Sequence, residues 1–127
     1  MNEQPIKVLI IEDEEMVRIN LEDFLEDDGF EVKSADSGEL GMELLGEYKF
    51  EIVVVDMRLP GMDGNTFIKE ANKIQPLLNF IIHTGSAFYT LPKEFRDMGI
   101  TKEQVLLKPL SDMEILTRAI RKLQTKK

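Results

Sequence analysis

Charged and polar side chains follow each of four short apolar runs in the sequence. The runs are Val8–Ile11, Ile52–Val55, Phe80–Ile82 and Val105–Leu107, and the polar residues at or just after their ends are Glu12, Asp13, Asp56, Thr84 and Lys108. If the runs are neighbouring strands of a parallel sheet, their carboxyl ends share one edge, where ligands of such sheets bind. The sequence therefore predicts one site built from three carboxylates, a hydroxyl and an ammonium group.

The three carboxylates, from Glu12, Asp13 and Asp56, indicate a cation site. Two unit charges about 5 Å apart repel by roughly 3 kcal/mol at an effective dielectric constant near 20, so three acids together need a proton or a cation. Oxygen-only ligands favour Mg²⁺. With Lys108 and Thr84 beside the metal the site suits a phosphoryl group, because phosphoryl transfer depends on positioning and on neutralising the phosphoryl oxygens. Asp56 is then the expected nucleophile, which accepts the group as an acyl phosphate.

The elements that must position these residues are predicted by the hydrophobic pattern. The apolar runs do not alternate with polar residues, which is typical of parallel strands covered by helices on both faces. A fifth run, Glu31–Ala35, has a mixed composition that suits an edge strand. Helical patterns separate the runs, so the prediction is an α/β fold with a single doubly wound, five-stranded parallel sheet and right-handed crossovers.

Local signals predict where the helices begin and end. A helix over Glu14–Asp28 stops at Gly29, and a helix capped by Ser37 runs to about Leu45 and stops at Gly46. Asp63 is expected to cap a helix that ends before Pro76, and Ser111 with Glu114 to form a capping box at the start of the last helix. Between these, only Lys93–Met98 has a helical pattern because Pro92 and Gly99 flank it, so a short or irregular fourth helix is expected.

Composition limits the class of protein. The 127 residues carry a net charge of −8 and no cysteine, which predicts one domain over residues 1–127, with a core at about 6–123, and excludes disulfides and thiol chemistry. Seventeen acidic but only four basic side chains lie in residues 1–56, so direct nucleic-acid binding is not expected. No stretch approaches the roughly 20 apolar residues that cross a bilayer, so we expect a cytoplasmic protein that does not contact a membrane.

Four motifs in this order and spacing resemble the receiver domain of two-component response regulators, the chemotaxis receivers among them. They are IIEDE at 10–14, VVDMRLPGMDG at 54–64, HTG at 83–85 and LLKPL at 106–110. The resemblance covers about residues 6–123 and implies a flavodoxin-like receiver fold with strand order 2-1-3-4-5. It also implies phosphorelay signal transduction, in which a partner histidine kinase or phosphotransfer protein donates a phosphoryl group to Asp56 with Mg²⁺ bound.

The resemblance assigns a role to each matching residue. Asp56 matches the phospho-acceptor, Asp13 the direct Mg²⁺ ligand, and Glu12 the acid that reaches the metal through water. Arg58 matches the residue whose backbone carbonyl contacts the metal. Lys108 matches the lysine that contacts the phosphoryl oxygens, and Thr84 the hydroxyl that moves toward the phosphate. Two smaller features follow: the Lys108–Pro109 bond is expected to be cis, and Gly85 to leave a path to Asp56 open.

A receiver of this kind catalyses only its own phosphorylation and dephosphorylation, and it is not otherwise an enzyme. Its signal is expected to be read through a protein-interaction surface by a downstream output protein, by a C-terminal output domain outside this chain, or in a homodimer. Because His83 lies next to Thr84 in an expected strand, its side chain should point to the other face of the sheet as a packed residue.

Three alternatives remain open. Family members commonly carry an aromatic residue three positions before the lysine, and here that position is Val105, which favours an interaction module that works without phosphorylation. A haloacid-dehalogenase-type phosphatase also uses a strand-end aspartate and Mg²⁺, but it needs a second aspartate where this chain has Arg58. A flavin-binding protein is disfavoured because no phosphate-binding loop follows Ile11.

Overall fold

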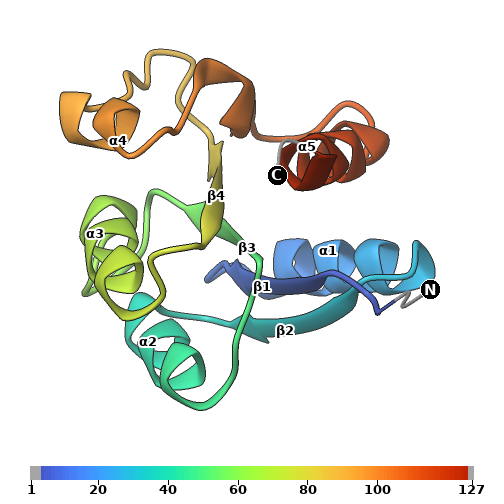
Figure 1. The fold of residues 1–127 in the computed structure, drawn as a ribbon. Coiled ribbons are helices and arrows are strands. Elements are labelled where there is room, and N and C mark those ends of the chain that lie inside the picture. The colour runs from blue at the N-terminus through green and yellow to red at the C-terminus, as the bar shows by residue number, and fades with distance from the viewer. Residues whose placement is uncertain (1–3, 126–127) are drawn as a thin grey trace.

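The computed structural model describes residues 4–125 and contains a five-stranded parallel sheet between two layers of helices (Figure 1). The strands are β1 (Lys7–Ile11), β2 (Glu31–Ala35), β3 (Ile52–Asp56), β4 (Asn79–Thr84) and β5 (Val105–Leu107). Their order is β2-β1-β3-β4-β5 and each neighbouring pair is parallel. The α/β fold class, the doubly wound sheet and the strand order 2-1-3-4-5 are thus confirmed.

The helices are α1 (Glu15–Asp27), α2 (Gly38–Glu47), α3 (Gly64–Ile74), α4 (Lys93–Asp97) and α5 (Glu114–Thr125), with a 3₁₀ turn at Lys102–Gln104. Helices α1 and α5 cover one face of the sheet, and α2, α3 and α4 lie on the other (Figure 1). The five residues of α4 confirm the predicted short fourth helix. Within the described residues, no helix is both long enough and apolar enough to span a membrane.

Side chains of each strand alternate between two buried cores. Leu9, Val53 and Ile82 pack toward α2, α3 and α4, whereas Ile10, Val54 and Ile81 pack toward α1 and α5. The three central strands β1, β3 and β4 are therefore buried on both faces, which is why their apolar runs are continuous in the sequence, whereas the edge strand β2 stays partly exposed. The same alternation of period two continues beyond the cores: Glu12, Asp56 and His83 fall on the α1/α5 side of the sheet, and Thr84 on the other.

Several predicted helix ends are confirmed. The Ser37 hydroxyl accepts the Leu40 N–H at 3.1 Å and the Asp63 carboxylate accepts the Thr66 N–H at 2.8 Å, so both residues cap their helices. Gly29 follows α1 with a φ of 95°, a conformation that ends helices and that glycine adopts without strain.

Two predicted helix ends are wrong. Gly46 does not stop α2, which continues to Glu47: the glycine lacks the positive φ of a helix stop, and Tyr48 N–H still donates to the Leu44 carbonyl at 2.9 Å. Ser111 does not open α5, which begins at Glu114. Asp112 takes the capping position instead, because its carboxylate accepts the Glu114 N–H at 2.9 Å while Met113 packs against the core.

Candidate functional site

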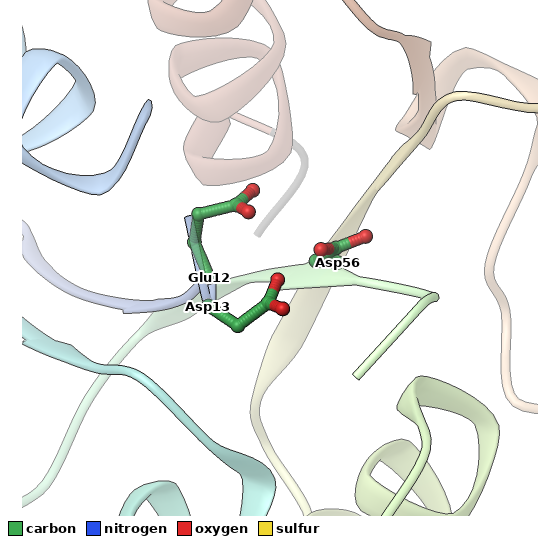
Figure 2. A group of neighbouring side chains, drawn as sticks. All are labelled: Glu12, Asp13 and Asp56. Carbon is green, nitrogen blue, oxygen red and sulfur yellow. The ribbon is translucent and has the colours of Figure 1, made fainter. Parts of the chain in front are cut away.

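Three carboxylates meet at the carboxyl edge of the sheet. Strands β1 and β3 are neighbours, with Ile11 paired to Val55, so the residues that follow them emerge side by side. One carboxylate oxygen from each of Glu12, Asp13 and Asp56 lies within 4.8 Å of the others. Figure 2 shows the three side chains turned toward a common space between the two strand ends. The sequence-predicted acidic cluster is therefore brought together by the fold.

Glu12 is the most deeply buried acid of the cluster, with 1% of its surface exposed. Its N–H donates to the Ala35 carbonyl of β2 at 3.0 Å, and its Oε2 accepts the Glu14 N–H at 3.2 Å, which fixes the side chain over the strand end. Burial raises the pKa of Glu12 to about 6; a hydrogen bond from Lys108 opposes this shift and the charge of Asp56 adds to it. Glu12 therefore holds its proton more readily than an ordinary glutamate.

Lys108 supplies the positive charge of the site. Its Nζ lies 2.9 Å from Glu12 Oε1, 3.3 Å from Asp56 Oδ2 and 3.5 Å from Glu14 Oε1. Burial alone would lower the pKa of Lys108, but the hydrogen bond and charge of Glu12, together with Asp56, raise it above its ordinary value. The ammonium group thus stays charged at neutral pH and partly neutralises the acids. The Lys108–Pro109 bond is cis, as the resemblance implied.

Asp56 is a buried residue, with 3% of its surface exposed, and its carboxylate is held from two directions. Its Oδ1 accepts the Arg58 N–H at 3.1 Å, and its Oδ2 faces Lys108. A carboxylate can accept about four hydrogen bonds, so both oxygens keep lone pairs for a metal or for an electrophile. Helix α3 begins very close to this strand end: a Cβ on Gly64 would lie 2.7 Å from the Asp56 carbonyl oxygen.

The other predicted site residues lie around this centre. Thr84 ends β4 and is buried, and its carbonyl accepts the Lys108 N–H at 2.7 Å. The Thr84 hydroxyl accepts a hydrogen bond from the Ser86 N–H at 3.1 Å. Among the described residues, this is its hydrogen bond, and Asp56 is not its partner. The Arg58 side chain is exposed, and a Cβ on Gly85 would meet no atom within 4 Å, so the loop beside the site is open.

Two neighbours of the site were not predicted as part of it. Glu14 contributes a carboxylate on the exposed side of Lys108, and His83 lies beneath the cluster with Nδ1 4.0 Å from Glu12 Oε1. Burial, followed by the charge of Lys108, lowers the pKa of His83 to about 4, so its ring is neutral at neutral pH. The signal that could have placed His83 here is its spacing of two residues after Ile81, which puts it on the same face as Asp56.

The donor set defines what the site can bind. Carboxylate oxygens suit a hard divalent cation, and a lysine ammonium adjacent to them suits an anion that shares the cation. Three carboxylates whose charge is only partly balanced by one lysine favour the entry of a cation, because each carboxylate repels the other two. The structure thus defines a class: a doubly wound α/β protein with an acidic, lysine-containing site at the carboxyl edge of its sheet.

Comparison with known proteins agrees with this class. The family model of the response regulator receiver domain matches residues 8–121, so the chain belongs to this family. The cell cycle response regulator CtrA of Brucella ovis is 26% identical over 113 residues, which are 89% of this chain and 48% of CtrA. The chain therefore spans about half the length of the curated relatives that it matches.

Solved structures of receiver domains share the fold. A receiver domain protein from Clostridium thermocellum is 29% identical with a TM-score of 0.77, and the match covers 95% of each chain. A response regulator receiver protein from Sinorhizobium medicae WSM419 is 26% identical with a TM-score of 0.79 and 96% coverage of each chain. The response regulator TrrA of Thermotoga maritima, solved in complex with Mg²⁺ and BeF, has a TM-score of 0.79 at 21% identity, covering 93% of this chain and 98% of TrrA.

Proposed function

We propose that Asp56 accepts a phosphoryl group from a phosphohistidine on a partner kinase or phosphotransfer protein. The observation that carries this proposal is the contact of the Asp56 carboxylate with the Lys108 ammonium at 3.3 Å, inside the cluster of three acids. A nucleophilic carboxylate, a fixed cation and a set of metal-type ligands are the parts that phosphoryl transfer to a protein acid requires.

The transfer is a substitution at phosphorus. An Asp56 carboxylate oxygen attacks, a P–O bond forms, and the P–N bond to the donor imidazole breaks. The imidazole leaves with the electron pair and takes a proton from solvent. Asp56 is suited to this attack because the Arg58 N–H and Lys108 hold its carboxylate in place while lone pairs on both oxygens stay free.

We further propose that Glu12, Asp13 and Asp56, with the Arg58 backbone carbonyl, hold Mg²⁺ at this edge of the sheet. The oxygen-only donor set, with one oxygen from each acid within 4.8 Å, fits such an ion. When bound, Mg²⁺ supplies positive charge that neutralises the phosphoryl oxygens. The TrrA structure, solved with Mg²⁺ and BeF, supports the metal by analogy.

Lys108 and Thr84 are proposed to respond to the phosphoryl group. The phosphoryl group on Asp56 carries a charge of about −2, and it competes with Glu12 for the Lys108 ammonium. The Thr84 hydroxyl, which now accepts the Ser86 N–H, can turn to donate to a phosphoryl oxygen instead. Such a turn removes one hydrogen bond from the loop after β4, so the loop would take up a second conformation that a partner protein can read.

The partners of the proposed reaction are a histidine kinase or phosphotransfer protein and an output component. Because the curated relatives extend well beyond the matched region, the output is proposed to be either a separate protein or a further domain. A second copy of this chain is a third possible reader of the phosphorylated form.

Intact-mass analysis after incubation with acetyl phosphate and Mg²⁺ tests this proposal. The wild type should gain an adduct of about 80 Da, and Asp56→Asn should gain none. Asp23→Asn, the same change at an exposed position of α1, is the matched control and should behave like the wild type. An adduct of equal yield on Asp56→Asn would refute the proposed acceptor. Steady turnover of p-nitrophenyl phosphate would instead indicate a phosphatase.

A further inference from the structure

Glu14 lies at the junction between the acidic cluster and α1. Its N–H donates to Glu12 Oε2 at 3.2 Å and its carbonyl accepts the Arg18 N–H at 2.9 Å, so its backbone is held on both sides. Among the described residues, its side chain makes no capping hydrogen bond to the helix. Its Oε1 lies instead 3.5 Å from Lys108 Nζ. The contact with Lys108, rather than capping of α1, therefore accounts for the direction of this carboxylate.

The Lys108 ammonium is shared among three carboxylates. Its Nζ lies 2.9 Å from Glu12, 3.3 Å from Asp56 and 3.5 Å from Glu14. An ammonium group carries three N–H donors, so a phosphoryl oxygen that binds Lys108 must displace one of these carboxylates. Asp56 is itself the proposed acceptor, so the group that gives way is either Glu12 or Glu14.

The contact with Glu14 is the easier of the two to break. The Glu12 side chain is 1% exposed, so its carboxylate would lose the nearby positive charge without gaining contact with water. The Glu14 side chain is 65% exposed, and water can solvate its carboxylate once Lys108 turns away. Glu14 can therefore hold the ammonium weakly in the unphosphorylated chain and release it to a phosphoryl group.

We propose that Glu14 is a positioning residue that competes with the phosphoryl group for Lys108 and thereby slows the phosphorylation of Asp56. This inference rests on the proposed function, because it concerns the regulation of that same site. Glu14 acts through Lys108: its carboxylate engages the ammonium before transfer, and its charge opposes the negative charge of the arriving group.

The rate of adduct formation with acetyl phosphate at saturating Mg²⁺ tests the proposal. Glu14→Gln keeps the size of the side chain and removes its charge, so the rate should rise about threefold, as expected for the loss of one exposed ion pair. A residue that supported the site's structure or recruited the metal would have the opposite effect when replaced. An unchanged or lower rate would therefore overturn the proposal.

Glu15→Gln is the matched control, because it makes the same charge change at the next residue. Glu15 is exposed in the first turn of α1, where acids interact favourably with the helix dipole, and among the described residues it forms no ion pair with Lys108. Its replacement should leave the rate within about 1.5-fold of the wild type. An equal gain in both variants would show that the general charge of this helix end, and not the contact with Lys108, controls the rate.

A double variant tests whether Glu14 acts through Lys108. If it does, Glu14→Gln should no longer raise the rate in a Lys108→Gln background, because the group for which the carboxylate competes is absent. A threefold gain that persists without the lysine would contradict the proposed route. A merely structural role of Glu14 would not make its effect depend on Lys108 in this way.

Binding of beryllofluoride at saturating Mg²⁺ separates this inference from the proposed transfer. Beryllofluoride takes the place of a phosphoryl group on a carboxylate, so its affinity reports the competition for Lys108 without a transfer step. Glu14→Gln should bind it about threefold more tightly than the wild type, and equal affinities would overturn the inference. Tighter binding by a chain that forms no adduct would instead count against the transfer alone.

Discussion

Lys108 lies closer to Glu12 than to Asp56, with its Nζ 2.9 Å from Glu12 Oε1 and 3.3 Å from Asp56 Oδ2. One ammonium group therefore balances two buried acids, and its shorter contact is with the acid that is not the proposed nucleophile. Any cation or phosphoryl group that enters the site changes this balance, because it competes for the same three charged groups.

The position of Lys108 predicts opposite effects on metal binding and on phosphorylation. Lys108→Gln removes a positive charge from the edge of the acidic cluster, so the Mg²⁺ affinity measured by calorimetry should rise at least about threefold. The rate of adduct formation with acetyl phosphate should fall about 100-fold, because a fixed cation that stabilises the phosphoryl oxygens is lost.

Lys93→Gln is the charge-matched control for this experiment. Lys93 is exposed on α4 and pairs with Asp97 at 2.9 Å, away from the cluster. Its replacement should leave the Mg²⁺ affinity and the rate of adduct formation within about twofold of the wild type. If Lys108→Gln lowers Mg²⁺ affinity and phosphorylation together, the lysine acts by holding the site in shape rather than by its charge.

Mg²⁺ should stabilise the folded chain through Asp13. At a Mg²⁺ concentration 100 times the dissociation constant, binding to the folded state contributes about 2.7 kcal/mol, which raises the melting temperature by several degrees. Asp13→Asn removes a proposed ligand that is exposed and therefore inexpensive to replace, so its melting temperature should respond much less. The melting temperature of Asp23→Asn should respond to Mg²⁺ as that of the wild type does. Shifts of equal size in all three proteins would refute the proposed metal site.

The burial of His83 predicts an unusual titration. It is the only histidine, so its ring protons can be followed by NMR without assignment of others, and they should report a pKa of about 4. Since this value is depressed below 6.5, the unfolded state binds the proton first. The neutral His83 ring therefore makes its full contribution to the free energy of unfolding above pH 6.5, and this contribution is lost as the pH falls from 6.5 toward 4.

Glu12 titrates with the opposite sign in part of the same range. Its raised pKa of about 6 means that the folded state holds a proton that the unfolded state has released, so its contribution to stability is lost as pH rises from 4.5 through 6. A global unfolding curve adds both effects, and for that reason the residue-specific signal of His83 is the decisive measurement. A measured His83 pKa near 6.5 would show that the ring is hydrated and not buried as the structure has it.

The sequence predicts this fold well because hydrophobic runs, helix caps and the order of strands and helices all indicate the same architecture. Continuous apolar runs such as Ile52–Val55 are explained by burial on both faces of the sheet, and the caps at Ser37 and Asp63 need only neighbouring residues. Glu12 and Asp56 could be placed together because the carboxyl ends of parallel strands share an edge. These inferences depend on the local hydrophobic pattern and on the order of strands and helices, and both can be read directly from the amino-acid sequence.

What sequence could not supply depends on packing between distant elements. Asp112 rather than Ser111 caps α5 because Met113 docks on the α1/α5 core, and either residue type is a good cap in isolation. The burial of the His83 ring beside Glu12, 4.0 Å from Nδ1 to Oε1, also depends on how α1 and α5 cover the sheet, which no spacing reveals. The predicted contact of Thr84 with a phosphoryl group likewise remains a prediction, since its hydroxyl accepts the Ser86 N–H here.

The close approach of α3 to the end of β3 predicts that Gly64 is essential to the site. A Cβ at this position would lie 2.7 Å from the Asp56 carbonyl oxygen and 2.8 Å from Met57 Cα, both backbone atoms that cannot turn away. Gly64→Ala should therefore destabilise the chain by about 1 to 3 kcal/mol, the usual cost of overpacking. Because the displaced segment carries Asp56, the adduct yield with acetyl phosphate should fall as well.

Gly46→Ala provides the contrast, since Gly46 lies inside α2 with no atom within 4 Å of the added Cβ. Alanine favours a helix interior over glycine by about 0.5 to 1 kcal/mol, so this variant should be more stable than the wild type in urea unfolding and should be phosphorylated normally. If the two alanine variants have the same stability, α3 is not packed against β3 as closely as the structure shows. The geometry that holds the Asp56 carboxylate beside Arg58 N–H would then need another explanation.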